Sequence, residues 1–133
     1  MRYLLDTNVC VDYLTGRHAP VITRIQAVNP ADMGVSSVVV AELRYGADKS
    51  KHKKRNHGLL DALLKELRCL DFSASTARAF GRIRAALEQR GESIGPYDTM
   101  IAAHALDLGC VLVTDNVKEF KRVKGLRVEN WRH

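Results

Sequence analysis

The chain has no long apolar run: no stretch of its 133 residues approaches the ~20 consecutive apolar residues of a membrane span. It also has no internal repeat, no low-complexity tract and no linker that would divide it. We therefore expect residues 1–133 to form a single domain, which is long enough to bury one core. The strand-like residues 2–5 leave no space for a signal peptide, so we expect neither a targeting segment nor a membrane partner.

Cysteine and aromatic residues are scarce. The three cysteines, Cys10, Cys69 and Cys110, include no C-x-x-C pair, which argues against a disulfide framework and against a zinc site. Because each lies among apolar neighbours, we expect three buried, reduced thiols and hence a cytoplasmic protein. Aromatic residues make up only 6% of the chain, which argues against a broad platform for stacking bases.

Negative charge is in the minority. The chain has 21 Lys and Arg against 15 Asp and Glu, a net charge of +6, which favours a polyanionic partner. Five of the cations, Lys49, Lys51, Lys53, Lys54 and Arg55, form one run. A solvated loop is the ordinary explanation of such a run. The same run would also suit phosphate contacts, in which case charge reversal at Lys53 and Lys54 weakens binding of the polyanion.

Short apolar runs alternate along the chain with segments of helical periodicity. The expected strands are residues 2–6, 33–36, 69–72 and 110–113, with an edge strand at 127–129. The expected helices are residues 9–14, 20–28, 37–46, 59–67, 73–91, 96–108 and 117–120. This alternation indicates an α/β fold with a mainly parallel sheet and right-handed crossovers. The apolar stripes of the helices, among them Leu59, Leu63 and Leu67, are expected to face the core.

Four acidic residues lie where an apolar run gives way to a helix signal. They are Asp6, Glu42, Asp98 and Asp115. In an open parallel sheet, ligands bind at the carboxyl ends of the strands, so acids at these junctions are expected to gather there. Packed carboxylates repel one another unless a cation neutralises them, and Mg²⁺ or Mn²⁺ suits oxygen ligands. On a basic protein, this predicts a metal site that hydrolyses phosphodiester bonds.

Each acid also has an ordinary structural explanation. Asp6 could cap the following helix, and Glu42 could be an exposed helical glutamate. Asp98 suits the dipole of a helix start, while Asp115 could begin a turn. These explanations hold one by one, but together they require four coincidences at neighbouring junctions.

The motifs around these acids resemble the PIN-domain ribonucleases, and specifically VapC-type toxins of bacterial toxin–antitoxin pairs. The resemblance covers nearly the whole chain, and the order and spacing of the motifs are specific even though each motif is short. The motifs are Leu4-Leu5-Asp6-Thr7-Asn8, Ser37-x-x-x-Ala41-Glu42-Leu43-x-x-Gly46, Ile94-Gly95-Pro96-Tyr97-Asp98-x-x-Ile101-Ala102-Ala103-His104-Ala105, Val113-Thr114-x-Asn116-x-x-x-Phe120 and Gly125-Leu126-Arg127-x-Glu129-x-Trp131.

The resemblance implies a PIN-like three-layer α/β/α domain that acts as a Mg²⁺-dependent endoribonuclease. It also implies inhibition by a VapB-type antitoxin, a homodimer, and contact with operator DNA only through the antitoxin complex. The implied substrate is a structured RNA such as tRNA, initiator tRNA among the candidates, whose cleavage inhibits translation. By position, Asp6 and Asp98 would bind the metal, and Glu42 would bind it or orient the attacking water.

The fourth acidic position departs from the family pattern. In register with Thr114 and Phe120 the usual acid falls on Asn116, which carries no charge, while Asp115 lies one residue earlier. Asn116 could offer its amide oxygen, and Asp115 or Glu119 could compensate as a metal ligand. The number of metal ions therefore stays open. His104 lies off the face of Asp98, so we expect a packed helical histidine and not a general base.

Two other functions remain as alternatives. A catalytically silent PIN protein that binds nucleic acid or regulates would be marked by loss of the acids, and only Asn116 points that way. A phosphatase or receiver-type protein would use the Asp-x-Asn segment after the first strand, but no matching lysine follows a later strand.

Overall fold

The central sheet has five strands in the order β3-β2-β1-β4-β5, and every neighbouring pair is parallel. The computed structural model describes all residues 1–133. The strands are β1 (Tyr3–Leu5), β2 (Met33–Ser36), β3 (Arg68–Leu70), β4 (Val111–Val113) and β5 (Val128–Glu129). The predicted α/β fold with a parallel sheet is confirmed, and the strand bounds differ from expectation by at most two residues at an end.

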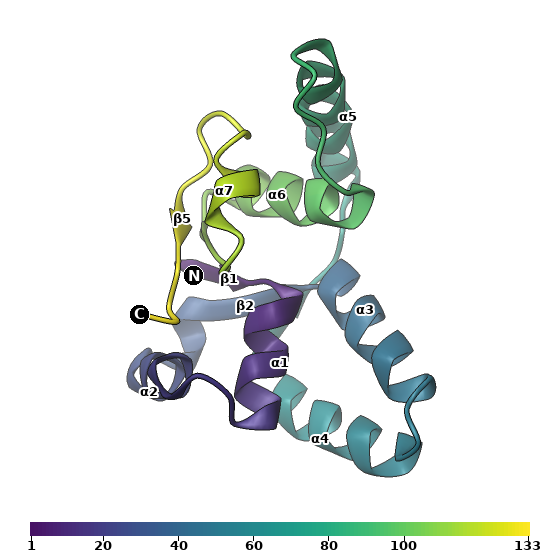
Figure 1. The fold of residues 1–133 in the computed structure, drawn as a ribbon, viewed down its shortest axis with the longest axis vertical. Helices are drawn as coiled ribbons and strands as arrows, with labels where there is room; N and C mark the ends of the chain where they lie inside the picture. Colours follow the sequence, from purple (N-terminus) through teal and green to yellow (C-terminus); the bar gives the residue numbers. More distant parts are fainter.

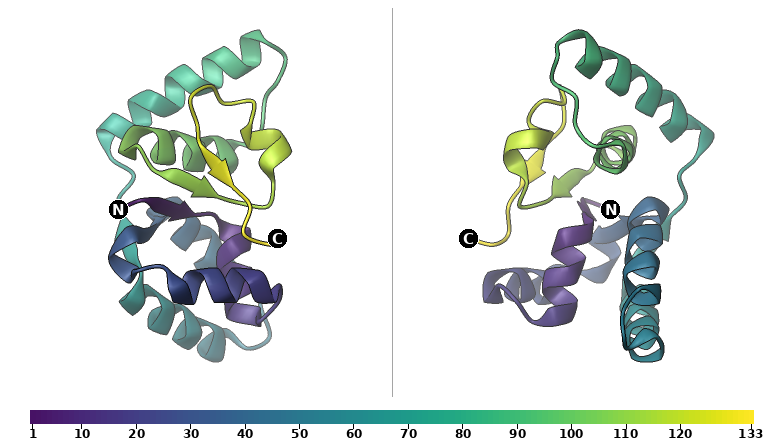
Figure 2. Two further views of the ribbon diagram at one scale, coloured as in Figure 1. Left: turned by 90° about the vertical axis from the view of Figure 1, so that its left-hand side faces the viewer. Right: turned by 45° about the vertical axis from the view of Figure 1, so that its right-hand side comes forward.

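Helices cover both faces of this sheet and make the three layers that were predicted. Figure 1 shows α1 to α4 on one side of the strands and α5 to α7 on the other, and the turned views of Figure 2 agree. The helices are α1 (Thr7–Thr15), α2 (Ala19–Ala27), α3 (Ser37–Asp48), α4 (Lys53–Glu66), α5 (Ala74–Gln89), α6 (Pro96–Leu108) and α7 (Val117–Phe120), with a 3₁₀ turn, η1, at Pro30–Asp32. None of the helices is long and apolar enough to cross a lipid bilayer.

Side-chain caps decide where several helices begin. Asp6 caps α1, so this helix starts at Thr7, two residues before the expected start. Ser36 and Ser73 cap α3 and α5 in the same way. At the other end of α1, Gly16 adopts the left-handed conformation (φ 74°) that a side chain would disfavour, and the helix stops there as expected.

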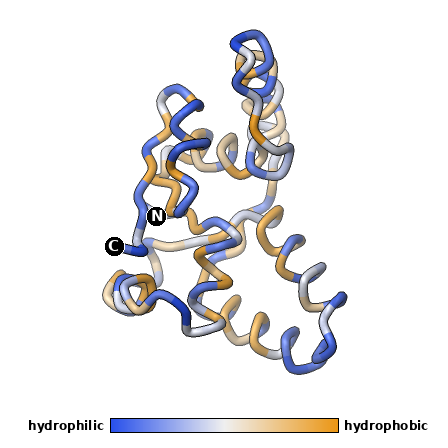
Figure 3. The backbone as a smooth tube through the Cα atoms, in the orientation of Figure 1, coloured by the Kyte–Doolittle hydropathy of each residue, from blue (hydrophilic) through white to orange (hydrophobic).

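The core lies on both faces of β1, the central strand, and of its neighbour β4. Leu4, Leu5 and Leu112 are fully buried, as is usual for parallel strands covered by helices on both sides. Near the C-terminus, Trp131 is buried and packs edge-on against Tyr3 of β1, with ring centroids 5.1 Å apart. Apolar residues therefore line the inner sides of the elements, whereas the connection between α3 and α4 is hydrophilic (Figure 3).

Several local expectations were wrong. Cys69 is exposed, because β3 is an edge strand of the sheet, so only Cys10 and Cys110 are buried thiols. Leu59 is 42% exposed although it belongs to the stripe expected in the core. Lys53–Glu66 is helical throughout, so the second half of the basic run opens α4 and is no loop.

Candidate active site

Asp6 lies at the carboxyl end of β1, between the sheet and α1. Its backbone N–H donates to Val113 O of β4 (3.0 Å), and its Oδ1 accepts from Val9 N of α1 (2.9 Å). The side chain of Thr114, at the end of β4, also hydrogen-bonds to it. The residue is only 5% exposed. Asp6 is thus both the helix cap of the ordinary explanation and a fixed carboxylate at the expected edge of the sheet.

Glu42 and Asp98 reach the same region from two helices. Glu42 lies on α3, and its Oε1 accepts from the Thr7 hydroxyl at 2.8 Å, which ties α3 to the start of α1. Asp98 lies in the first turn of α6 and is half-buried. His104 links the two helices, because its Nδ1 lies 2.8 Å from the Oγ of Ser36, the residue that caps α3.

His104 itself is buried and packs edge-on against Phe72. Burial lowers the pKa of its imidazole, which keeps the ring neutral. The predicted role as a packed helical histidine is therefore confirmed.

Burial and mutual repulsion perturb the acids at this edge. Burial, followed by the charges of Asp115 and Asp98, raises the pKa of Asp6 from 3.8 to about 7, against the opposing hydrogen bonds from Thr114 and Val9. Burial, then Glu119 and Glu42, raises the pKa of Asp98. Burial is the larger cause of both shifts, and the charges of neighbouring carboxylates add to it.

No cationic side chain forms an ion pair with Asp6, Glu42 or Asp98. The hydrogen bond to Asp12 and, to a smaller extent, the charge of Asp6 raise the pKa of the Arg132 guanidinium. The ion pairs of the molecule involve other acids, and neither Lys, Arg nor His pairs with these three. A hard divalent cation would fit such a set of oxygen donors. No three His, Cys, Asp or Glu side chains converge closely enough to enclose an ion, so the fitting arrangement is the usual one for Mg²⁺, with one or two carboxylates and several waters.

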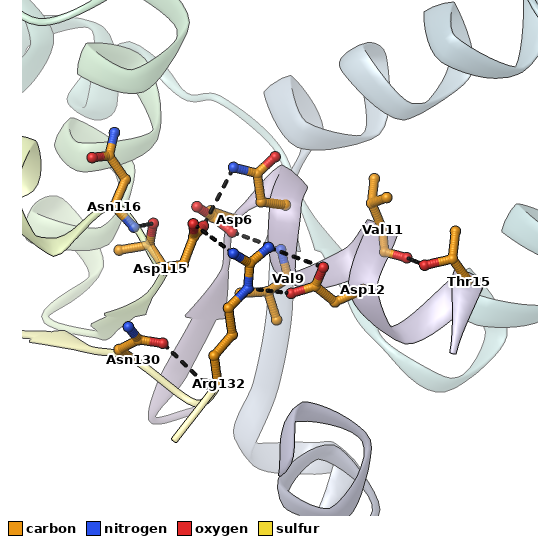
Figure 4. Close-up of polar contacts among 11 residues, drawn as sticks. Asp6, Val9, Val11, Asp12, Thr15, Asp115, Asn116, Asn130 and Arg132 are labelled. Atoms are coloured by element: carbon orange, nitrogen blue, oxygen red, sulfur yellow. Dashed lines mark hydrogen bonds and ion pairs between the residues drawn. The ribbon is translucent and has the colours of Figure 1, made fainter. Parts of the chain in front are cut away.

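Asp115 and Asn116 are placed differently from each other. Asp115 Oδ1 accepts from Asn8 Nδ2 (3.3 Å), and its Oδ2 accepts from Arg132 Nη1 (2.9 Å). Asn116 donates its amide Nδ2 to Glu119 Oε2 (2.9 Å), and in Figure 4 its side chain points away from Arg132. Of the residues considered for the fourth position, Glu119 is the one whose charge raises the pKa of Asp98.

Two charged residues of this region were not predicted from the sequence. Asp12 of α1 is buried, and it pairs with Arg132 through two hydrogen bonds, Nε to Oδ2 (2.8 Å) and Nη2 to Oδ1 (3.0 Å) (Figure 4). One signal was present, because Asp12 interrupts an otherwise apolar segment between Val9 and Leu14. Nothing in the sequence pointed to its partner near the C-terminus.

Comparison with known proteins identifies the family to which this architecture belongs. The family model of the PIN domain matches residues 3–126. The chain belongs to the PIN-domain family. Among curated PIN-domain relatives it is 40% identical over 131 residues to the tRNA(fMet)-specific endonuclease VapC of Shigella flexneri, with 98% of each chain covered. It is 44% identical over 134 residues to the ribonuclease VapC2 of Rickettsia felis, again with 98% of each chain covered.

A solved structure shares the whole fold of this PIN domain. The chain superposes on a chain of DNA-bound VapBC from Salmonella typhimurium with a TM-score of 0.93, at 38% identity and with 98% of both chains covered. The predicted membership of the VapC group of PIN domains is therefore confirmed, and so is the predicted three-layer fold.

Proposed function

We propose that this PIN domain is a Mg²⁺-dependent endoribonuclease toxin that hydrolyses phosphodiester bonds in a structured RNA. The proposal rests first on three carboxylates, Asp6 after β1, Glu42 in the middle of α3 and Asp98 at the start of α6, none of which forms an ion pair within the chain. Burial and neighbouring carboxylates raise the pKa of Asp6 and of Asp98. The ribonuclease names of VapC relatives at 40% and 44% identity support the RNA substrate. We further propose that the toxin acts in the cytoplasm, inhibits translation, and cleaves a tRNA, the substrate class in the name of the Shigella relative.

The residues have separable tasks in this proposal. Asp6 and Asp98 would hold the Mg²⁺, which would supply a water molecule of lowered pKa and positive charge for the scissile phosphate. Thr7 holds Oε1 of Glu42, and Oε2 of Glu42 remains free to accept a hydrogen bond from the attacking water. Thr114 and the N–H of Val9 fix Asp6, so the metal ligand is oriented before the substrate arrives.

The basic turn at the start of α4 is the proposed contact for the RNA backbone. Lys53, Lys54 and Arg55 are all exposed there, and α3, which is about 18 Å long and carries Glu42 at its middle, leads to this turn. Three cations in the first turn of a helix oppose its dipole, so their placement costs stability. Such a cost is understandable if the cations bind phosphates.

An apolar groove beside the acid site is the proposed seat of a VapB-type antitoxin. The groove has a volume of about 300 Å³ and lies between α1, α3 and α4. Val11 and Leu59, which are among the few exposed large apolar residues, line it, and Glu42 lies at its edge. The related Salmonella toxin forms a DNA-bound VapBC complex, and contact of this chain with operator DNA would likewise run through its antitoxin.

Purified protein and total RNA test the catalytic part of the proposal. We expect cleavage with Mg²⁺ or Mn²⁺, none in excess EDTA, and products that carry a 5′-phosphate and a 3′-hydroxyl because water is the nucleophile. Products with a 2′,3′-cyclic phosphate, or full cleavage in EDTA, would contradict it. The absence of any cleavage under all these conditions would favour a catalytically silent PIN protein.

The RNA target needs an experiment in cells. Sequencing of RNA ends after a short induction, with an Asp6→Asn variant as the control, identifies ends that depend on the acid site. We expect new ends confined to one or a few tRNAs. Ends spread over many messenger RNAs would contradict the tRNA part of the proposal and leave the nuclease part intact.

A further inference from the structure

Arg132 makes a bridge between two acids at the edge of the site. Its Nε and Nη2 donate to both oxygens of Asp12 at 2.8 and 3.0 Å, and its Nη1 donates to Asp115 at 2.9 Å. The side chain of Asp12 is 5% exposed and that of Asp115 is 24% exposed, so neither carboxylate is freely solvated. A guanidinium that binds one carboxylate with two hydrogen bonds is held in a fixed orientation.

The backbone around Arg132 is anchored as well. The preceding residue, Trp131, is buried, and its Nε1 donates to Glu129 Oε1 at 3.0 Å. Arg132 N donates to Asn130 Oδ1 at 2.9 Å, a local turn that directs the arginine toward α1 (Figure 4). The guanidinium position is therefore set by packing and hydrogen bonds together.

Both carboxylate oxygens of Asp115 already accept a hydrogen bond from the chain. One of its oxygens accepts from Asn8 and the other from Arg132. A divalent cation bound at Asp115 would also lie against the fixed positive charge of Arg132, which repels it. Asp6, Glu42 and Asp98 accept no hydrogen bond from Arg132, whose guanidinium acts on Asp6 only through its charge and beyond ion-pair distance.

We propose that Arg132 is a positioning residue whose guanidinium takes the place of a second metal ion at Asp115 and so limits the site to one divalent cation, bound by Asp6 and Asp98. This inference rests on the metal dependence of the proposed function. It gives Asp115 a structural role and removes it from the candidate metal ligands. Arg132 also neutralises Asp12, because a buried aspartate without a partner would lower the stability of the fold.

The number of bound Mn²⁺ ions tests the proposal without reference to RNA cleavage. Arg132→Gln alone would leave Asp12 buried and unpaired, so the informative protein is the double variant Asp12→Asn/Arg132→Gln, which removes both charges of the pair. Asp12→Asn alone is the matched control, because Arg132 can still hold Asp115. Calorimetric titration and electron paramagnetic resonance of free Mn²⁺ give the stoichiometry, and circular dichroism checks the fold.

We expect one Mn²⁺ per chain in the natural protein and in Asp12→Asn, and a second, weaker ion in the double variant. Addition of Asp115→Asn to the double variant should abolish the second ion. Two ions in the natural protein, or a single ion in every variant, would overturn the role of Arg132 and leave the proposed nuclease untouched. No ion in the natural protein would overturn both this inference and the proposed metal dependence.

Discussion

Two pairs of acids near the same edge of the sheet have opposite electrostatic surroundings. Asp12 and Asp115 share the guanidinium of Arg132. Asp6 and Asp98 form no ion pair, and burial together with neighbouring carboxylates raises the pKa of both. The acids are similar in kind, but only the first pair is neutralised by the chain itself.

This difference distinguishes acids that serve the fold from acids that serve the functional site. An acid that the fold needs is given a counter-charge by the same chain, because an uncompensated buried carboxylate is strongly destabilising. An acid that lacks a counter-charge lowers the stability of the metal-free fold, and such groups are typical of functional sites. This contrast is the reason for the proposal that Asp6 and Asp98 bind an external cation, whereas Arg132 neutralises Asp12 and Asp115.

The largest expected effect is on RNA cleavage by an Asp98→Asn variant. The substitution removes a proposed metal ligand and also relieves repulsion in the fold. We therefore expect a loss of cleavage of about 10³-fold or more, with no loss of stability. Single-turnover cleavage and thermal unfolding measure the two quantities.

Asp71→Asn is the matched control for this loss. Asp71 also follows a strand of the sheet, β3, but it is exposed and lies at the edge strand. We expect cleavage by this variant to stay within a few-fold of the natural protein. A comparable loss in both variants would show that charge at this edge, and not metal binding at Asp98, controls the reaction.

The next effect concerns the stability of the metal-free protein as a function of pH. The pKa of Asp6 rises from 3.8 to about 7 on folding, so the folded state binds this proton more tightly than the unfolded state does. Stability from this group is complete below about pH 4 and is lost as the pH rises toward 7. Asp6→Asn should therefore gain up to about 4 kcal/mol over the natural protein at neutral pH and above, and almost nothing in acid.

Urea unfolding of both proteins in EDTA across this pH range measures the difference. Added Mg²⁺ should reduce it at neutral pH, because the ion binds only the natural carboxylate. A difference that does not change with pH would contradict the assignment of the raised pKa to Asp6.

Substitution at the ion pair of Asp12 and Arg132 should lower stability, whereas substitution of Asp6 should raise it. Arg132→Gln leaves Asp12 without its partner, so we expect a loss of roughly 2–3 kcal/mol, less than for a fully buried pair because the arginine side chain is 28% exposed. Asp12→Asn/Arg132→Gln should regain most of that loss. A double-mutant cycle measures this coupling, and additive effects would show that the pair contributes nothing.

The sequence predicted the acids without an ion pair better than it predicted the ion pair of Asp12 and Arg132. Asp6, Glu42 and Asp98 follow recognisable patterns, because strand ends and helix starts leave local signals. Asp12 and Arg132 are 120 residues apart, and their contact depends on how Trp131 anchors the end of the chain against Tyr3. No local pattern encodes such a contact. The exposure of Cys69 was missed for the same reason, since strand order is not a local property.

The smallest expected effect concerns the cations at the start of α4, where stability and RNA affinity should change in opposite directions. Lys53→Glu/Lys54→Glu replaces two exposed cations of the first helical turn by anions, which the helix dipole favours. Stability should therefore rise, by about 0.3–1 kcal/mol per residue. RNA affinity should fall about tenfold, and the slope of its salt dependence should decrease by about 0.7 for each phosphate that the variant no longer neutralises.

Lys65→Glu is the control, since this exposed lysine lies at the opposite end of the same helix. There an anion is disfavoured by the dipole, so stability should fall slightly while RNA affinity changes little. Opposite signs of stability and affinity at Lys53 and Lys54 would show that these cations are kept for a ligand, against the preference of the helix that carries them. Equal RNA affinity of both variants across a salt series would instead return the basic turn to an ordinary solvated surface.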